Sequence, residues 1–252
     1  MVAAIESMVK NILENTPGIA VTLHQARSGH VVFHYRFDGA SGGDGHYVKG
    51  FERGVYDRND LSFHHHDMIY PMRTVRGLPE FDSLHYRTGL LLDGLRDIER
   101  TSRRSVVINP GQGHVPVVLW RWLRPDSIVL VDRDLLSLRC SRENLVLNGC
   151  TEEHVVLKHV VGFSVSEGEP AGLVTGVLRE DEGPGAAFET VKNVAGCLAP
   201  EGLMVLAAGS TAISRLMERI KEETRLEVIE MTKKRGNRLI ILRARSTGLS
   251  LS

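Results

Sequence analysis

A glycine-containing loop is the part of the chain whose residue types and spacing most directly suggest chemistry. It reads Asn109-Pro-Gly-Gln-Gly-His-Val-Pro116 and lies between a predicted strand, Ser105 to Asn109, and a predicted helix, Val115 to Leu123. Gly111 and Gly113 would let the backbone turn tightly and approach a ligand closely, and the helix would present its N-terminal amides to that ligand. The loop is therefore a candidate ligand-binding loop.

An acidic residue at the end of the next predicted strand, Ser127 to Val131, adds to this pattern. Asp132 follows that strand, and a carboxylate in this position accepts hydrogen bonds from both hydroxyls of a ribose. Nucleotide-type cofactors are held in this way in open α/β sheets. We therefore take Asp132, with Arg133 beside it, as candidate cofactor-binding residues.

Two other interpretations of the loop stay open. Gly111 and Gly113 could simply make a tight turn, with Asp132 capping a helix that starts near Asp134. A dinucleotide site of a nicotinamide-dependent oxidoreductase is the rival functional interpretation, but its third glycine would fall at Pro116. Antiparallel pairing of the last two predicted strands would exclude the oxidoreductase.

The elements that must position these residues begin near Gly77-Leu78-Pro79. From there, apolar strand-like runs alternate with helical patterns up to a predicted helix from Ala212 to Glu223, which is typical of a parallel sheet covered on both faces. The ending differs, because the runs Leu226 to Met231 and Arg238 to Arg243 are separated only by a turn. The sequence therefore predicts an α/β domain over residues 78–252, with a mostly parallel sheet closed by an antiparallel hairpin.

The first 77 residues have a different texture and predict a small α+β cap or substrate-binding region. A helix is expected from Ala3 to Glu14 and a half-buried strand from Val31 to Phe37. The glycine-rich run Asp38 to Gly45 predicts a hairpin connection, and Tyr47 to Tyr56 the returning strand.

Composition limits the partners and the compartment. Lysine and arginine total 31, as do aspartate and glutamate, so the formal charge is +0 and no global field attracts nucleic acid or anionic lipid. The 3 cysteines form no Cys-x-x-Cys pair, which favours a reducing compartment over disulfides or a thiolate metal site. With no secretory signal or membrane span expected, we predict a soluble cytoplasmic protein with no membrane partner.

Taken together, these residues resemble the class I S-adenosylmethionine-dependent methyltransferases, and more narrowly the "methyltransferase small" family, which includes ribosomal RNA guanine-N2 methyltransferases. The resemblance runs from about Leu78 to Arg245. It rests on these segments: Leu78-Pro-Glu-Phe81, Thr88 to Leu92, Asn109 to Gly113, Asp132, Ser141 to Asn144, Leu147-Asn-Gly149, Leu198 to Leu203 and Arg235 to Arg245.

The resemblance implies a Rossmann-like fold with a seven-stranded sheet, S-adenosylmethionine as cofactor, and methylation of RNA. It also implies that the cofactor is bound by Asn109, Gly111, Gly113, Asp132 and Arg133. Basic clusters at Arg96 to Arg104, Arg121 and Arg124, and Lys233 to Arg235 could contact RNA phosphates.

The sequence departs from the family pattern at two places. Asn109 stands where the family has an acid that organises the methionine amino group. Val177-Leu-Arg-Glu180 replaces the Asn-Pro-Pro-Phe/Tyr that grips the amine to be methylated. Glu180 and Asp181 could offer a base, so with Arg179 they are the candidate catalytic residues, although Arg179 to Glu182 could also be a solvated loop. The alternative is a catalytically degenerate protein of this fold that serves as an RNA- or protein-binding module.

A histidine-rich segment, His64-His-His66-Asp67, raises the question of a metal ion. On a strand, His64 and His66 would share one face, and imidazoles are common ligands of transition metals. No third ligand at suitable spacing is evident in the sequence. We therefore expect no metal site and a surface or substrate-groove role for this segment.

Overall fold

The computed structural model describes residues 2–27, 30–37, 56–98, 104–160, 170–180, 183–223 and 225–245. The chain divides into two compact units, Met1–Arg53 and Gly54–Ser252, which are described separately. The predicted connection 38–45 and the predicted strand residues 47–55 lie outside the described residues.

The first unit contains one helix and a two-stranded ribbon. Helix α1 (Val2–Glu14) precedes strands β1 (Ile19–Arg27) and β2 (His30–Phe37), which pair antiparallel. The helix and β2 were predicted, whereas β1 was not. In β1, His24 stacks on Phe33 of β2 with ring centroids 4.8 Å apart and lies 2.7 Å from Glu6 of α1. This contact ties the helix to the ribbon.

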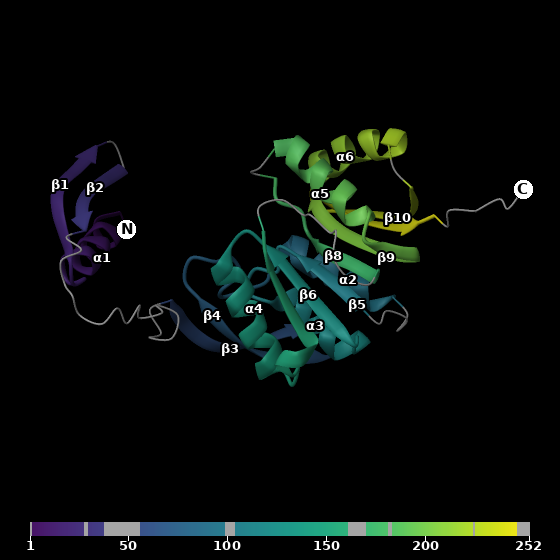
Figure 1. The fold of residues 1–252 in the computed structure, drawn as a ribbon, viewed down its shortest axis with the longest axis horizontal. Helices are drawn as coiled ribbons and strands as arrows, with labels where there is room; N and C mark the ends of the chain where they lie inside the picture. Colours follow the sequence, from purple (N-terminus) through teal and green to yellow (C-terminus); the bar gives the residue numbers. More distant parts are fainter. Residues whose placement is uncertain are drawn as a thin grey trace, which may run out of the picture. The chain divides into compact units, whose positions relative to one another are not determined.

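The second unit is built on a seven-stranded sheet in the order β10-β11-β9-β8-β5-β6-β7 (Figure 1). Neighbours from β9 to β7 run parallel, and β11 and β10 run antiparallel, so the predicted mixed sheet is confirmed. The antiparallel closing hairpin excludes the nicotinamide-dependent oxidoreductase. The strands are β5 (Arg104–Ile108), β6 (Ser127–Asp132), β7 (Val155–His159), β8 (Ala171–Val177), β9 (Leu198–Gly209), β10 (Leu226–Lys234) and β11 (Asn237–Ala244).

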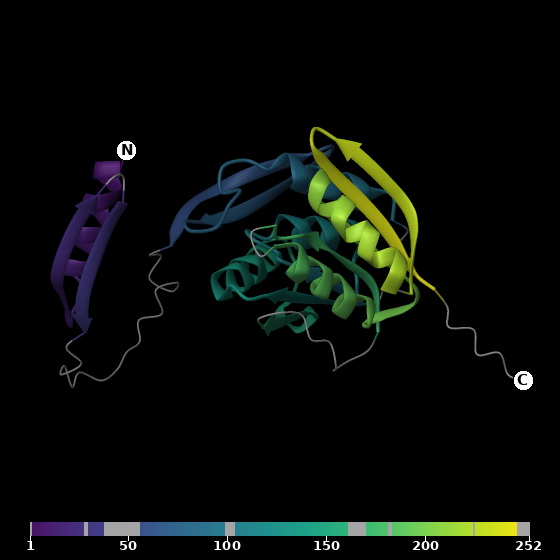
Figure 2. The ribbon, with the colours of Figure 1, turned by 90° about the horizontal axis from the view of Figure 1, so that it is seen from above.

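Helices cover both faces of this sheet (Figure 2). Strand β5 shows why, because Val107 belongs to one apolar core while Val106 and Ile108 belong to the other. One core contains residues of the helices α2 (Tyr86–Arg96), α3 (His114–Leu123) and α4 (Leu135–Leu147), and the other contains residues of α5 (Gly183–Ala195) and α6 (Ser210–Glu223). A short 3₁₀ turn, Glu152–His154, precedes β7.

A β-hairpin extends the first of these cores beyond the predicted domain. Strands β3 (Asp57–His65) and β4 (Met68–Val75) pair antiparallel, and their side chains Phe63, Tyr70 and Met72 are buried in the core with α2, α3 and α4. The compact unit therefore starts at Gly54, whereas the sequence places the boundary after Gly77. The hairpin belongs to the second unit because this apolar face is buried there.

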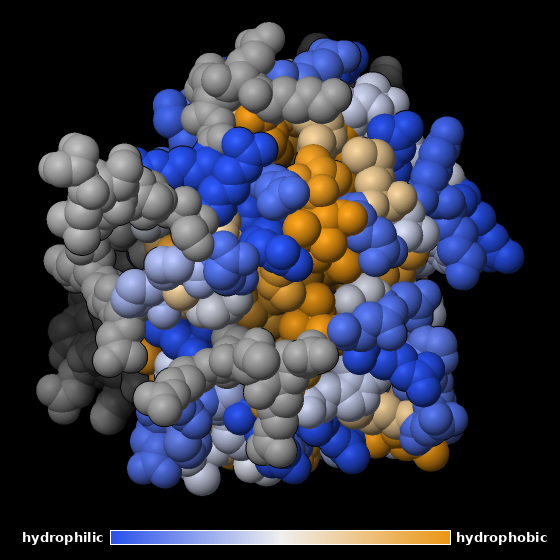
Figure 3. Space-filling view, turned by 90° about the vertical axis from the view of Figure 1, so that its right-hand side faces the viewer, coloured by the Kyte–Doolittle hydropathy of each residue, from blue (hydrophilic) through white to orange (hydrophobic). Residues whose placement is uncertain are grey.

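Strand β10 forms one edge of the sheet and carries exposed apolar side chains. Val228, Ile229 and Met231 are exposed, and the space-filling view shows apolar surface bordered by hydrophilic residues (Figure 3). Glu227 precedes them and Glu230 lies between Ile229 and Met231, and charges on an edge strand oppose pairing with a second strand.

All three cysteines, Cys140, Cys150 and Cys197, are free thiols and are buried. Burial raises the pKa of the Cys150 and Cys197 thiols to about 11. In the part of the chain that the structure describes, no helix is both long and apolar enough to span a membrane.

Candidate functional site

A cavity of about 770 Å³ opens beyond the carboxyl ends of the parallel strands β5 and β8, and we call it the carboxyl-edge cavity. Open α/β sheets bind ligands at this edge, where the strand order reverses between β5 and β8. Its walls are the segment Gly77 to Glu80, the start of α2 from His85 to Thr88, the glycine loop, Asp134 and Ser137, the segment Val177 to Glu180, and Asn237.

The two glycines of the loop have different reasons to be glycine. Gly111 lines the cavity with φ 58°, and a Cβ added to it would meet nothing within 4 Å. Gly113 has φ 101° and is the N-cap of α3, where a Cβ would lie 2.9 Å from the Cα of Ser141. Gly111 therefore leaves open space beside a cavity wall, whereas Gly113 allows α4 to approach the loop closely.

Gln112, between these glycines, is a residue that the sequence analysis did not single out. Its side chain is fully buried, accepts a hydrogen bond from the amide of Val75 and donates to the carbonyls of Val75 and Leu78. Through these bonds the loop is fixed to the end of β4. A polar residue flanked by glycines was the only sequence signal, and it does not identify the partner.

Asn109 takes part in holding the loop against the sheet. Its Nδ2 donates to the carbonyl of Val177 on β8 at 2.9 Å, and its amide donates to the carbonyl of Val131 on β6. Its φ is 50°, in the left-handed region that asparagine tolerates better than most residues. The side chain thus links the loop to β8 across the point where the strand order reverses.

Asp132 is buried at the end of β6 and is bound to Arg179. Its Oδ1 lies 2.6 Å from the guanidinium of Arg179 and accepts from the amide of Asp134, while its Oδ2 accepts from the hydroxyl of Ser137. The Asp132 side chain is 0% exposed and that of Arg179 is 27% exposed. A predicted cofactor residue and a predicted catalytic residue are therefore joined in one ion pair.

This ion pair lies at a small cavity of about 50 Å³ next to the larger one. Asp132, Arg133 and Arg179 line the small cavity, and Arg179 lines both. Arg133 is exposed, and its carbonyl lies 3.0 Å from Nε2 of His159. Asp132 lines the small cavity but not the carboxyl-edge cavity.

Asp134 is the N-cap of α4, a role that the sequence analysis considered for Asp132. Its side chain accepts hydrogen bonds from the amides of Leu136 and Ser137, which satisfies groups left unpaired in the first turn of a helix. Asp132 supports this turn through Asp134 and Ser137 rather than capping it directly.

Glu180 is engaged in the structure by two other groups. Its Oε1 accepts from the amide of Gly209 at 2.8 Å and lies 2.8 Å from the guanidinium of Arg87. This arrangement joins β9, α2 and the segment after β8. Asp181, the third candidate catalytic residue, lies outside the described residues.

His114, which begins α3, is a buried titratable group in the cavity wall. Its Nε2 lies 3.1 Å from the carbonyl of Glu80, so this nitrogen carries the proton, and Nδ1 accepts from the hydroxyl of Tyr70. Burial lowers the pKa of His114, with an opposing contribution from Glu80. Burial also raises the pKa of Tyr70, so both groups are neutral near pH 7.

Basic side chains meet an aromatic ring at one rim of the cavity. Arg235 and Lys234, at the tip of the β10–β11 hairpin, lie 5.1 and 5.9 Å from the ring centroid of Tyr86, which lines the cavity. Both cations are exposed. In the other clusters, Arg100 and Arg103 lie outside the described residues, and Arg121 donates to the carbonyl of Ile69.

Comparison with known proteins establishes the fold. No family model matches the chain, and no curated protein matches it significantly. Among solved structures, the T. thermophilus 16S rRNA N2 G1207 methyltransferase (RsmC), solved with AdoMet and guanosine, has a TM-score of 0.63 at 15% identity, covering 96% of this chain and 62% of its own.

Two further structures cover mainly the sheet-containing part. The ribosomal protein L11 methylase from Lactobacillus delbrueckii subsp. bulgaricus has a TM-score of 0.56 at 12% identity, over 65% of this chain and 80% of its own. An rRNA methylase from Streptococcus thermophilus has a TM-score of 0.51 at 12% identity, over 64% and 98%. The chain therefore has the Rossmann-like fold of class I methyltransferases.

Proposed function

We propose that this protein is an S-adenosylmethionine-dependent methyltransferase that acts on RNA. The observation that carries the proposal is the carboxyl-edge cavity. Gly111 lines it with open space beside its Cα, and the segment after β8 and the start of α4 line it as well. The fold alone does not fix a function, so the site must support the proposal.

The positions of Gly111 and Asp132 at the ends of β5 and β6 suit S-adenosylmethionine. Its adenosyl part would lie along the ends of β5 and β6, with Gly111 beside it and Asp132 on the ribose hydroxyls. Because Arg179 holds Oδ1 of Asp132, the guanidinium must move before that oxygen can accept from a ribose. The cofactor, when bound, would supply a methyl group attached to a positively charged sulfur.

The chain's own contribution would be positioning. Holding two reactants in line supplies about 7 to 11 kcal/mol of the barrier reduction in well-oriented reactions. Arg87 and Glu180 form an ion pair at the cavity wall and keep the segment after β8 beside α2. We assign Arg179 and Glu180 to positioning this segment, and Asp181 stays a candidate for the proton acceptor.

An RNA acceptor is supported by the rim of the cavity. Lys234 and Arg235 lie over the ring of Tyr86, and both cations are exposed, so two positive charges stand at this rim. Exposed cations neutralise phosphates, which contributes to the binding of single-stranded RNA. The rRNA methylases among the similar folds make the same acceptor class the first one to test.

A second candidate, an RNA- or protein-binding module without methyl transfer, is favoured by the Asp132–Arg179 ion pair. A carboxylate that is fully buried and already bound by three groups of its own protein gives no free acceptor to a ribose. Asn109 is likewise used within the fold.

One experiment separates the two candidates. Calorimetry with S-adenosylmethionine and its demethylated product is combined with transfer of a radiolabelled methyl group to RNA and protein fractions. The methyltransferase predicts binding and labelled RNA, both lost in Asp132→Ala and kept in Glu201→Ala, which changes an exposed carboxylate near the start of β9. If no heat is measured at millimolar ligand and no fraction is labelled, the methyltransferase is rejected and the binding module is supported.

A further inference from the structure

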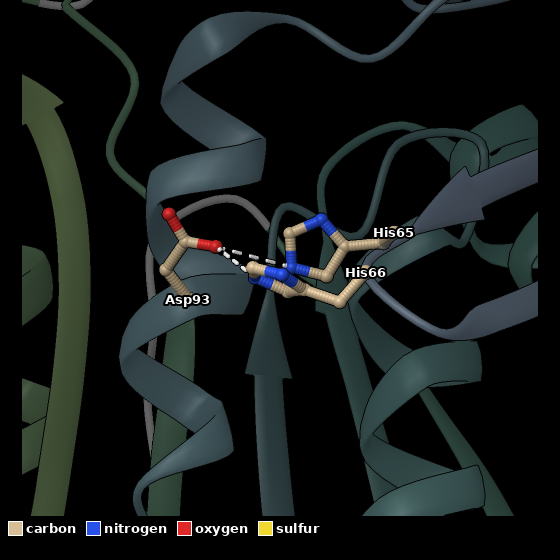
Figure 4. Close-up of side chains that lie close together, drawn as sticks. All are labelled: His65, His66 and Asp93. Atoms are coloured by element: carbon tan, nitrogen blue, oxygen red, sulfur yellow. Dashed lines mark hydrogen bonds and ion pairs between the residues drawn. The ribbon is translucent and has the colours of Figure 1, made fainter.

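Two histidines and an aspartate converge where the β3–β4 turn meets helix α2. Nε2 of His66 lies 2.8 Å, and Nε2 of His65 lies 3.3 Å, from the same oxygen, Oδ1 of Asp93 (Figure 4). The three ligand-type atoms all lie within 4.8 Å of one another. None of these three described residues lines the carboxyl-edge cavity, so the cluster is separate from the proposed methyltransferase site.

The backbone explains why two consecutive histidines face the same helix. Strand β3 ends at His65, and His66 has φ 49°, in the left-handed region, as the chain turns toward β4. Side chains alternate only while the strand continues. The expectation that His64 and His66 would share a strand face is therefore wrong, because His66 lies in the turn and His64 is exposed.

His65 is buried in a way that leaves one ring nitrogen unsatisfied. The residue is 9% exposed, and its Nε2 is a buried atom with no hydrogen-bond partner among the described residues, although Oδ1 of Asp93 is nearby. Leaving such an atom without a partner is unfavourable, and each case in a folded protein calls for an explanation. Packing fixes the ring, with Trp122 of α3 at 5.9 Å and His66 at 4.5 Å between centroids.

We propose that His65, His66 and Asp93 bind a divalent first-row transition-metal ion of the Zn²⁺ type. Two imidazoles and one carboxylate form a typical donor set for such ions, whereas Mg²⁺ and Ca²⁺ prefer oxygen ligands. Tetrahedral ligands at zinc distances are about 3.3 Å apart, close to the observed 2.8 and 3.3 Å. The side chains of His66 and Asp93 are 42% and 40% exposed, which leaves the ion accessible to water as a further ligand.

Charges of both signs lie near the cluster. Asp93 supplies one negative charge, and Arg96, the cation that acts electrostatically on His65, lies 3.8 Å from Asp67. Bound there, the ion would join the β3–β4 hairpin to α2, whose first turn lines the cavity. The inferred role is to stabilise this junction, and it does not depend on the proposed methyl transfer.

The test uses the untagged chain of 252 residues after chelator treatment, titrated with Zn²⁺ by calorimetry and with Co²⁺ by visible absorption. The variants are His66→Ala and Asp93→Asn, which change half-exposed side chains. The matched control is His64→Ala, the exposed neighbour on β3. Circular dichroism of each metal-free protein checks that it is folded.

The proposal expects one Zn²⁺ per chain and a Co²⁺ spectrum without thiolate bands, since all three cysteines are buried. Affinity should fall at least about tenfold in His66→Ala and Asp93→Asn and stay unchanged in His64→Ala. Zn²⁺ should raise Tm of the parent and of His64→Ala, but not of those two variants. No binding by the parent, or equal affinity in the control and the ligand variants, overturns the proposal.

Discussion

Two groups of polar side chains near the carboxyl-edge cavity differ in their partners. On the side of β6, Asp132 is bound to Arg179 and Ser137 within the protein, and its side chain is 0% exposed. On the side of the closing hairpin, Lys234 and Arg235 are exposed beside the ring of Tyr86. The polar groups of Asp132 are thus engaged within the protein, whereas the charges of Lys234 and Arg235 are open to solvent.

Removing the buried carboxylate should have the largest effect. Asp132→Ala removes the ion pair with Arg179 and the hydrogen bonds from Ser137 and Asp134, and should lower the free energy of unfolding by about 3 kcal/mol. Asp134→Ala, which removes only the N-cap of α4, should cost about 1 kcal/mol. Urea denaturation measures both, and an equal or smaller loss for Asp132→Ala would contradict the inward-facing role of this residue.

The two loop glycines differ in what they face, because Gly113 packs against the protein and Gly111 lines the cavity. Gly113→Ala should lower stability by about 3 kcal/mol, because φ is 101° and the Cβ would press on the backbone of Ser141. Gly111→Ala should lower it by only about 1 kcal/mol, since the left-handed φ of 58° is its main cost and the space is open. The same denaturation assay compares them, and the reverse order would refute this assignment.

Freeing the carboxylate should strengthen cofactor binding. Arg179→Ala removes a charged hydrogen bond of about 1.5 kcal/mol that competes with the ribose, so affinity for S-adenosylmethionine should rise about tenfold in calorimetry. The control is Arg219→Ala on α6, where the arginine stacks on Phe188. Weaker binding in Arg179→Ala would indicate that the guanidinium contacts the ligand and does not compete with it for Asp132.

The cations at the tip of the β10–β11 hairpin should determine how RNA affinity depends on salt. If Lys234 and Arg235 each contact a phosphate, their double alanine variant should bind RNA about tenfold more weakly, and the slope of log K against log salt should become about 1.4 to 1.8 smaller in magnitude. Fluorescence anisotropy measures both quantities. A double change at Arg215 and Arg219, exposed on α6, controls for net charge and should leave the slope unchanged.

The smallest expected effect is the pH dependence due to His114. Burial lowers its pKa in the folded protein, Glu80 and His85 act on it in opposite directions, and Tyr70 stays neutral. Below pH 6.5, the approximate pKa of His114 in the unfolded chain, this histidine is protonated in the unfolded chain but stays neutral in the folded protein. The free energy of unfolding therefore falls as pH decreases. His114→Gln should reduce the loss of stability between pH 7 and 5.5, measured by urea titrations at both pH values. An unchanged pH profile would refute the contribution.

The order of elements could be predicted from sequence because buried parallel strands appear as continuous apolar runs, as in Ser105 to Ile108. The position of Asp132 at the same sheet edge as the glycine loop follows from parallel pairing of β5 and β6. Strand β1 was missed because polar residues such as Thr22, His24 and Gln25 interrupt its apolar pattern in a two-stranded ribbon.

The partners of individual side chains could not be predicted in the same way. Arg179 reaches Asp132 across 47 positions of sequence, and Gln112 reaches Val75 across 37, so no local spacing links them. The histidine segment shows the same limit at short range. A single left-handed residue, His66, changes which of the histidines face α2, and its backbone conformation has no distinct sequence signal.

The buried thiols can report local unfolding of the protein, because a reagent reaches them only when their surroundings open. With pKa values near 11, Cys150 and Cys197 are almost entirely protonated at pH 8, and burial shields all three thiols from alkylating reagents. Modification of a thiol by iodoacetamide, read peptide by peptide, would therefore report how often the surroundings of that cysteine open. Cys140 lies against Gln112 under the glycine loop, so its rate would follow the breathing of that loop separately from the rest of the sheet.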